Sequence, residues 1–192
     1  MIIIADPKLN AVRQLNGLAS WWDGQHWRHK PIGYLRTDRL RGYDTQTHPR
    51  TYLPINGAAL GSRSIASAVD RGSVRILADK LSAADVEIRL APALAALHAI
   101  NSLTEGPEGG SGLPYPFLGF GPNSNSFFST LLRAMQLEEP RFSRPARLAP
   151  GAGKLLLSHQ ALDNIRQGRS LTSGSRNSVI AAAIASTPAS VG

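Results

Sequence analysis

Apolar residues occur along this chain in short runs with different spacings, which predicts several short strands and helices. The β-branched run from Met1 to Ala5 ends at Asp6-Pro7 and predicts an edge strand. Apolar residues then recur every three positions, at 9, 12, 15 and 18, which predicts a helix that begins near Pro7. The first elements would therefore be a strand and then a helix.

Residues 20–52 differ in character, because they hold all three tryptophans, three of the five histidines and an excess of basic residues. Asp23-Gly24 lies between two aromatic flanks and predicts a hairpin turn. Residues 31–35 are expected to form the next strand. Together these features predict a sheet with one basic face exposed to water.

Three further helices are predicted in the second half of the chain. Ser82 is a suitable N-cap for an apolar pattern over 83–103, which Pro92 must begin, kink or divide. A second helix begins near Ser126 and carries one apolar stripe, and a third is expected over 155–167. The stripe consists of Phe127, Phe128, Leu131, Leu132 and Met135.

The order of these elements predicts an α+β fold, in which a small antiparallel sheet packs against helices. Residues 1–170 would form a single domain. Residues 171–192 are small and rich in serine and alanine, so we expect them to form a loosely ordered tail.

Composition permits a packed core and favours an anionic partner. The chain has 192 residues, of which 42% are hydrophobic, so it has the size and apolar content of one folded domain. Its net charge of +8 would suit nucleic acid, a phospholipid surface or an acidic protein, and a merely basic surface explains the charge equally well. The absence of cysteine excludes disulfides, thiolate metal sites and a cysteine nucleophile. No metal or other cofactor is predicted.

The sequence predicts neither a membrane span nor an export signal. No segment reaches the roughly 20 apolar residues that a membrane-spanning helix needs. The N-terminal residues lack the basic region and the cleavage site of a signal peptide. We therefore expect a cytoplasmic protein, or one delivered by a non-classical secretion route.

The stretch from Leu113 to Leu137 places small polar residues at the start of the second predicted helix. Asn123, Ser124 and Asn125 would lie at or just before the first turn, where backbone N–H groups lack helical partners and the helix dipole is positive. One of them could serve simply as an N-cap, worth about 1 kcal/mol, and the spacing alone favours this. The alternative is a nucleophile or an anion site presented at the helix end.

The sequence GPNSNSF, with Tyr-Pro shortly before it, resembles the Pro-Gly-Pro-Asn-Ser-Asn-Thr-Phe signature of DUF3750, a bacterial family of uncharacterised function. The resemblance covers roughly residues 83–154 and includes 150–154, which is similar to a Gly-Lys element of that family. It departs from the family at Ser126, where threonine is usual. The resemblance implies a bacterial protein with binding roles for the matching side chains. These are Tyr115, Asn123, Asn125, Ser126 and Lys154.

The same helix start resembles the Asn-Cys-x-x-Phe pattern of circularly permuted papain-like proteins, the NlpC/P60 and LRAT-like group. In that pattern Ser124 falls at the position of the cysteine, and the resemblance implies His26 or His29 as the base. A serine hydroxyl is harder to ionise than a thiol and needs an aligned base and oxyanion donors. Ser124 is therefore a true nucleophile, a relic, a binding group or an engineered replacement of cysteine.

Two functions follow from these patterns. The first is a hydrolase or acyltransferase acting on an amide or ester, with Ser124 as nucleophile and His26 or His29 as base, and a bacterial toxin or effector is one setting for it. The second is a non-catalytic module whose basic surface docks an anionic protein, nucleic acid or membrane. No nucleic-acid-binding signature is present, so nothing in the sequence favours nucleic acid among these partners.

Overall fold

The computed structural model describes residues 2–6, 11–30, 33–47, 75–116, 121–140 and 150–169. Five strands and three helices lie within these ranges. The strands are β1 (Ile2–Asp6), β2 (Ala11–Trp22), β3 (Trp27–Lys30), β4 (Arg39–Thr47) and β5 (Leu113–Pro114). The helices are α2 (Ala83–Asn101), α3 (Ser124–Ala134) and α4 (His159–Arg166).

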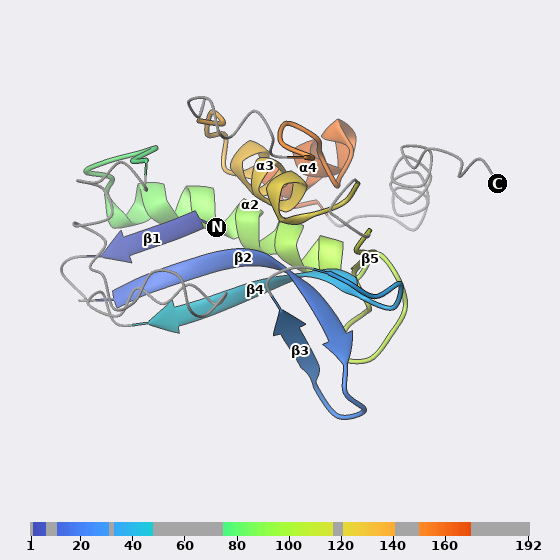
Figure 1. The fold of residues 1–192 in the computed structure, drawn as a ribbon. Helices are drawn as coiled ribbons and strands as arrows, with labels where there is room; N and C mark the ends of the chain where they lie inside the picture. Colours follow the sequence, from blue (N-terminus) through green and yellow to red (C-terminus); the bar gives the residue numbers. More distant parts are fainter. Residues whose placement is uncertain are drawn as a thin grey trace.

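The strands form one antiparallel sheet around the long strand β2. Strand β4 pairs with β2 along one edge of β2. Strand β5 pairs with the first two residues of β4 and so adds a strand on the far side of β4. The other edge of β2 is shared, because β1 pairs with its first half and β3 with its last four residues. The β2–β3 hairpin therefore extends beyond the rest of the sheet (Figure 1).

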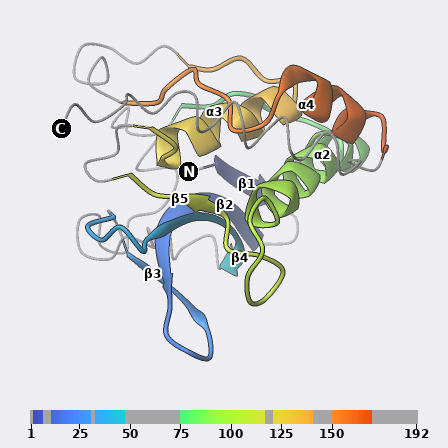
Figure 2. The same ribbon diagram turned by 90° about the vertical axis from the view of Figure 1, so that its right-hand side faces the viewer.

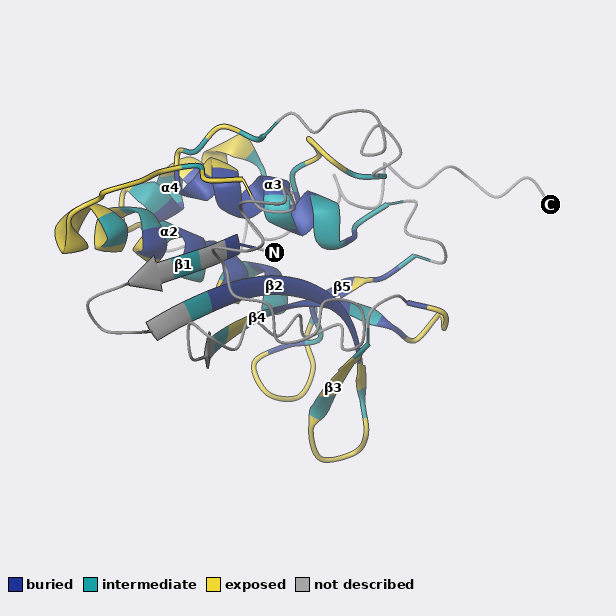
Figure 3. Ribbon diagram, turned by 60° about the vertical axis from the view of Figure 1, so that its left-hand side comes forward, coloured by how far each residue is buried: buried dark blue, intermediate teal, exposed yellow. Residues whose placement is uncertain are grey.

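The helices lie together on one face of the sheet (Figure 2). Helices α2 and α3 contact the central strands, and α4 packs against both of these helices. The burial colours in Figure 3 place the core between the sheet and the helices, whereas the β2–β3 turn is exposed. At the end of α2, the side-chain amide of Asn101 accepts the backbone N–H of Gly42 and donates to its backbone C=O. These two bonds connect α2 to strand β4.

Helix α3 packs against the sheet through one aromatic ring, which contacts two glycines. Gly17 of β2 lies directly opposite Gly42 of β4, and both face the helices. A Cβ atom on Gly17 would lie 2.4 Å from Cγ of Phe127, and one on Gly42 would lie 2.8 Å from the same ring. Phe127 is only 1% exposed, so the ring fills the space that two side chains would otherwise occupy.

The structure confirms the α+β class and several local predictions. Ser82 caps α2, and Pro92 lies within that helix without dividing it. The turn at Asp23-Gly24 joins β2 to β3, with Gly24 at a φ of 103°. The third predicted helix forms as α4, which is shorter than expected.

Two predictions about the first 35 residues are wrong. The segment predicted as a helix from Pro7 contains strand β2. In this strand Leu15 and Ala19 face the helices, and Leu18 is buried on the opposite face. Burial on both faces removes the alternation by which a strand is usually recognised. The strand expected at 31–35 is also misplaced, since β3 ends at Lys30 and residues 33–38 form a loop.

Two predictions about the fold are not tested by the described residues. A permuted papain-like arrangement is a more specific claim than the α+β class and stays a prediction. The tail predicted at 171–192 lies outside the described residues. Among the helices described, none combines the length and the apolar character required to cross a membrane.

Candidate functional site

At the start of α3, polar side chains of the same turn bind the backbone N–H groups. Oδ1 of Asn123 accepts the backbone N–H of Asn125 at 2.8 Å and that of Ser126 at 3.1 Å. In return, Oγ of Ser126 accepts the backbone N–H of Asn123 at 2.8 Å. Asn123 is 3% exposed and Ser126 is 1% exposed. These reciprocal bonds form a capping box, so Asn123 is the N-cap that the spacing favoured.

The same asparagines also hold the loop that leads to Lys154. Nδ2 of Asn123 and Nδ2 of Asn125 both donate to the carbonyl oxygen of Pro150, at 2.7 and 3.0 Å. Gly151 follows with a φ of +83°, and a Cβ there would lie 2.8 Å from the Asn123 amide. Lys154 itself is exposed. Asn123, Asn125 and Ser126 therefore have structural roles that account for their polar side chains.

Ser124 lies beside Tyr115 rather than beside a histidine. Ser124 is half-buried, and both its side chain and its backbone lie close enough to the phenol of Tyr115, which is 6% exposed, to act on the pKa of that group. Burial raises the pKa of Tyr115 above its ordinary value, and Ser124 opposes this only in part. The phenol is therefore protonated at neutral pH and does not serve as a base for the serine.

The two predicted base residues have other neighbours. His26 lies in the exposed β2–β3 turn, with its Nδ1 3.5 Å from a carboxylate oxygen of Glu108. His29 lies on β3 with its ring centroid 5.4 Å from that of Tyr43. Within the described residues, no hydrogen bond joins Ser124 to a histidine. The structure thus gathers Tyr115, Asn123, Asn125 and Ser126 around Ser124, whereas both histidines lie in the hairpin.

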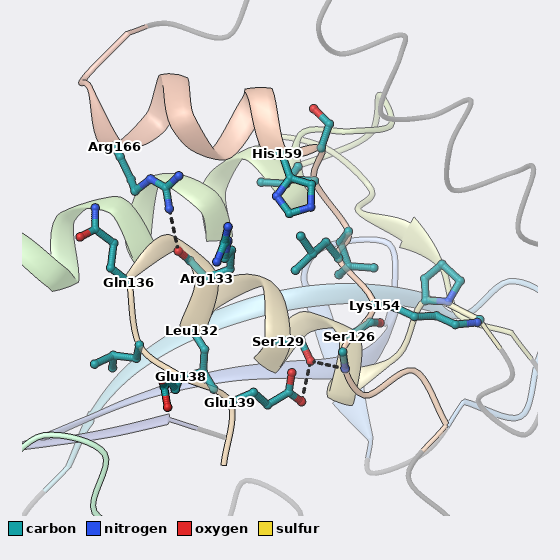
Figure 4. A pocket seen from close by; sticks show the side chains of 18 residues that line it. Ser126, Ser129, Leu132, Arg133, Gln136, Glu138, Glu139, Lys154, His159 and Arg166 are labelled. Atoms are coloured by element: carbon teal, nitrogen blue, oxygen red, sulfur yellow. Dashed lines mark hydrogen bonds between the residues drawn. The ribbon is translucent and has the colours of Figure 1, made fainter. Parts of the chain in front are cut away.

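A cavity of about 1200 Å³ opens between α3 and the segment that leads into α4 (Figure 4). Oγ of Ser129 lies 2.9 Å from a carboxylate oxygen of Glu139 and accepts the backbone N–H of Gly153 at 3.0 Å. Arg166 donates to the carbonyl oxygen of Arg133 at 3.2 Å. These groups bind one another, and residues 141–149 lie outside the described chain. We therefore assign no ligand to this cavity.

A second cluster of functional interest lies in the loop of residues 33–38, and its organising group is a buried carboxylate. Oδ2 of Asp38 accepts the backbone N–H of Tyr34 at 2.7 Å and that of Leu35 at 2.8 Å. The same oxygen lies 2.8 Å from Nζ of Lys30, and Asp38 is fully buried. Burial raises the pKa of Asp38, but the ion pair with Lys30 and the two N–H donors lower it further, so the net shift is downward.

This carboxylate fixes a loop whose side chains point into water. Tyr34 is 60% exposed, Leu35 is 59% exposed and Trp21 on the adjacent strand is 37% exposed. The Lys30 ammonium lies 5.5 Å from the ring centroid of Trp21 and 5.7 Å from that of Tyr34. Arg36 is exposed beside them. We call this set, Trp21, Lys30, Tyr34, Leu35 and Arg36, the Tyr34 surface.

The sequence did not predict the Tyr34 surface, because Tyr34 and Leu35 fall within the strand expected at 31–35. The exposed aromatic and apolar side chains become neighbours only when Asp38 folds back onto the N–H groups three and four residues earlier. The available signal was the spacing between Asp38 and Tyr34, since aspartate favours turns by accepting nearby backbone N–H groups.

Comparisons with known proteins add no assignment to either cluster. Neither family models, curated proteins nor solved structures gave a match to this chain. Within the described residues, no three histidine, aspartate or glutamate side chains come together as a metal site would require.

Proposed function

We propose that this protein is a non-catalytic module that docks an anionic partner through the Tyr34 surface. The observation that carries the proposal is the pairing of a fully buried Asp38 carboxylate with two large, exposed side chains, Tyr34 and Leu35. Burying a carboxylate and exposing large apolar groups are both unfavourable in a free protein. Lys30 and two N–H donors already compensate the buried carboxylate, so a contact made by Tyr34 and Leu35 would offset the cost that is left, which is their exposure to water.

The charge around this surface supports an anionic partner. Four basic side chains lie in the hairpin, the loop and the start of β4, against two carboxylates, so this end of the molecule has an excess of positive charge. Arg28 pairs with Asp23 and Lys30 pairs with Asp38. Arg36 has no ion pair within the described residues, which leaves its guanidinium available to a partner. The charge of the whole chain, +8, acts in the same direction.

The hydrolase or acyltransferase hypothesis is the less supported proposal. It needs a base that removes the proton of Ser124 and donors that stabilise an oxyanion. Ser124 lies beside Tyr115, whose pKa is raised, and the first-turn N–H groups of Asn125 and Ser126 are bound by Asn123. A permuted papain-like site, and with it a toxin or effector role, would require a rearrangement of these bonds.

Heparin affinity chromatography tests the docking proposal. We expect the protein to be retained at 0.15 M salt, on the order of physiological ionic strength, and Arg36→Gln to elute at lower salt. Arg75→Gln is the matched control, because Arg75 is also exposed and the same charge is removed elsewhere. Equal elution of the two variants, or no retention of the unmodified protein, would contradict the proposal. Ser124→Ala should elute with the unmodified protein.

A further inference from the structure

We infer that the partner of the Tyr34 surface is an anionic phospholipid bilayer, whose headgroup region receives Trp21, Tyr34 and Leu35. This inference rests on the proposed docking function and specifies the chemistry of its partner. It is carried by three features of the surface: its satisfied backbone groups, the kinds of side chain it exposes, and the occupied faces of its aromatic rings.

Three backbone N–H groups of the loop are bound within the loop itself. The N–H groups of Tyr34 and Leu35 are bound by Asp38, and the N–H of Asp38 donates to the carbonyl oxygen of Leu35 at 3.0 Å. A backbone group that enters lipid without a partner costs several kcal/mol. Because these bonds already exist in the free protein, the tip can leave water without losing them.

The exposed side chains match the layers of a membrane interface. Tryptophan and tyrosine favour the headgroup level, where a ring can be apolar at one end and hydrated at the other. Leu35, which is 59% exposed, offers an aliphatic group to the acyl boundary below. Lys30 and Arg36 can direct their charged ends toward anionic lipid phosphates while their stems stay with the apolar groups.

The aromatic rings are less suited to single-stranded nucleic acid. Base stacking needs open ring faces, but Lys30 lies over one face of Trp21 and one face of Tyr34, and the Arg41 guanidinium lies 4.4 Å from the ring centroid of Trp27. Trp27 also packs against Trp22 at 5.7 Å. Leu35 has neither a ring to stack nor a group to donate a hydrogen bond. A bilayer interface offers favourable surroundings to the aromatic, aliphatic and basic side chains of this surface together.

The position of the surface also allows contact with a plane. The hairpin of β2 and β3, which carries Trp21 and Lys30, extends away from the three helices (Figures 1 and 3). The loop of 33–38 follows β3 directly and is held to it by the bond between Lys30 and Asp38. The two segments can therefore approach a membrane together.

Vesicle co-sedimentation provides the test. We expect the protein to bind vesicles of phosphatidylcholine and phosphatidylserine and to ignore vesicles of phosphatidylcholine alone. Leu35→Ser should weaken binding about tenfold, the scale expected when one leucine no longer leaves water. Ile88→Ser is the matched control, because Ile88 is 71% exposed but lies on α2. Urea unfolding of both variants checks that each is folded.

The outcomes separate this inference from the docking function. If the protein binds heparin through Arg36 but Leu35→Ser binds vesicles as well as Ile88→Ser does, the bilayer inference is overturned and the docking function stands. Tight binding to single-stranded DNA without vesicle binding would make nucleic acid the partner instead. If neither heparin nor anionic vesicles are bound, both proposals are overturned together.

Discussion

The contact between Phe127 and the two facing glycines makes a strong prediction about stability. Gly17→Ala would place a methyl group 2.4 to 2.7 Å from three carbon atoms of Phe127. Carbon atoms in ordinary contact lie about 3.5–4.0 Å apart, so the ring would have to move by roughly 1 Å. Gly42 lies near the far end of the same ring, at Cε2 and Cζ, and Leu97 lies beside Gly42, which limits this movement.

We expect Gly17→Ala to lower the free energy of unfolding by about 1–3 kcal/mol, the usual cost of overpacking a core. An alanine for a glycine in a strand would otherwise stabilise the protein by about 0.4–1 kcal/mol, because it restricts the unfolded chain. A decrease in the free energy of unfolding would therefore indicate the contact with Phe127, and an increase would indicate that the contact is absent. Urea unfolding followed by tryptophan fluorescence measures it, since all three tryptophans lie in β2 and β3.

A double-mutant cycle identifies Phe127 as the cause. Phe127→Ala removes Cγ and Cδ1, two of the three atoms that the new methyl group meets, so Gly17→Ala should cost less in the Phe127→Ala background. We expect a favourable coupling of about 0.5–3 kcal/mol, as for other contacting residues. An unchanged or increased stability of Gly17→Ala, or additive effects in the double variant, would refute the proposed seating of α3.

Two further predictions concern polar groups. Asn123→Ala should lower the free energy of unfolding by about 2 kcal/mol in a urea titration, because it removes an N-cap and a donor to Pro150; a loss below about 0.5 kcal/mol would contradict the capping role. Asp38 has a lowered pKa in the folded state, so its stabilisation is present above the unfolded pKa, about 3.9, and is lost as the pH falls through the folded pKa. Between pH 4 and pH 2, the unfolding free energy of Asp38→Asn should therefore decline less steeply than that of the unmodified protein, and equal slopes would contradict this.

Local chemistry made parts of this fold predictable, whereas long-range packing hid others. Ser82, Asn123 and the Asp23-Gly24 turn could be recognised because caps and turns depend on a few neighbouring residues. Strand β2 could not, because its burial on both faces depends on elements distant in the sequence. The approach of Ser124 to Tyr115 likewise brings together two segments whose proximity cannot be read from the spacing of residues.

The two clusters in this molecule differ in which of their groups lack partners, and this difference bears on function. At the start of α3, the N–H groups of Asn125 and Ser126 are already bound by Asn123, so an oxyanion there would have to replace hydrogen bonds worth about 1 kcal/mol each. At the Tyr34 surface the backbone N–H groups of Tyr34 and Leu35 are bound by Asp38, while the side chains of these two residues are left in water. A binding site needs groups that improve their contacts when the partner arrives. The residues that look most like a catalytic motif are therefore those with the least to gain from a ligand, and the loop beside the hairpin has the most.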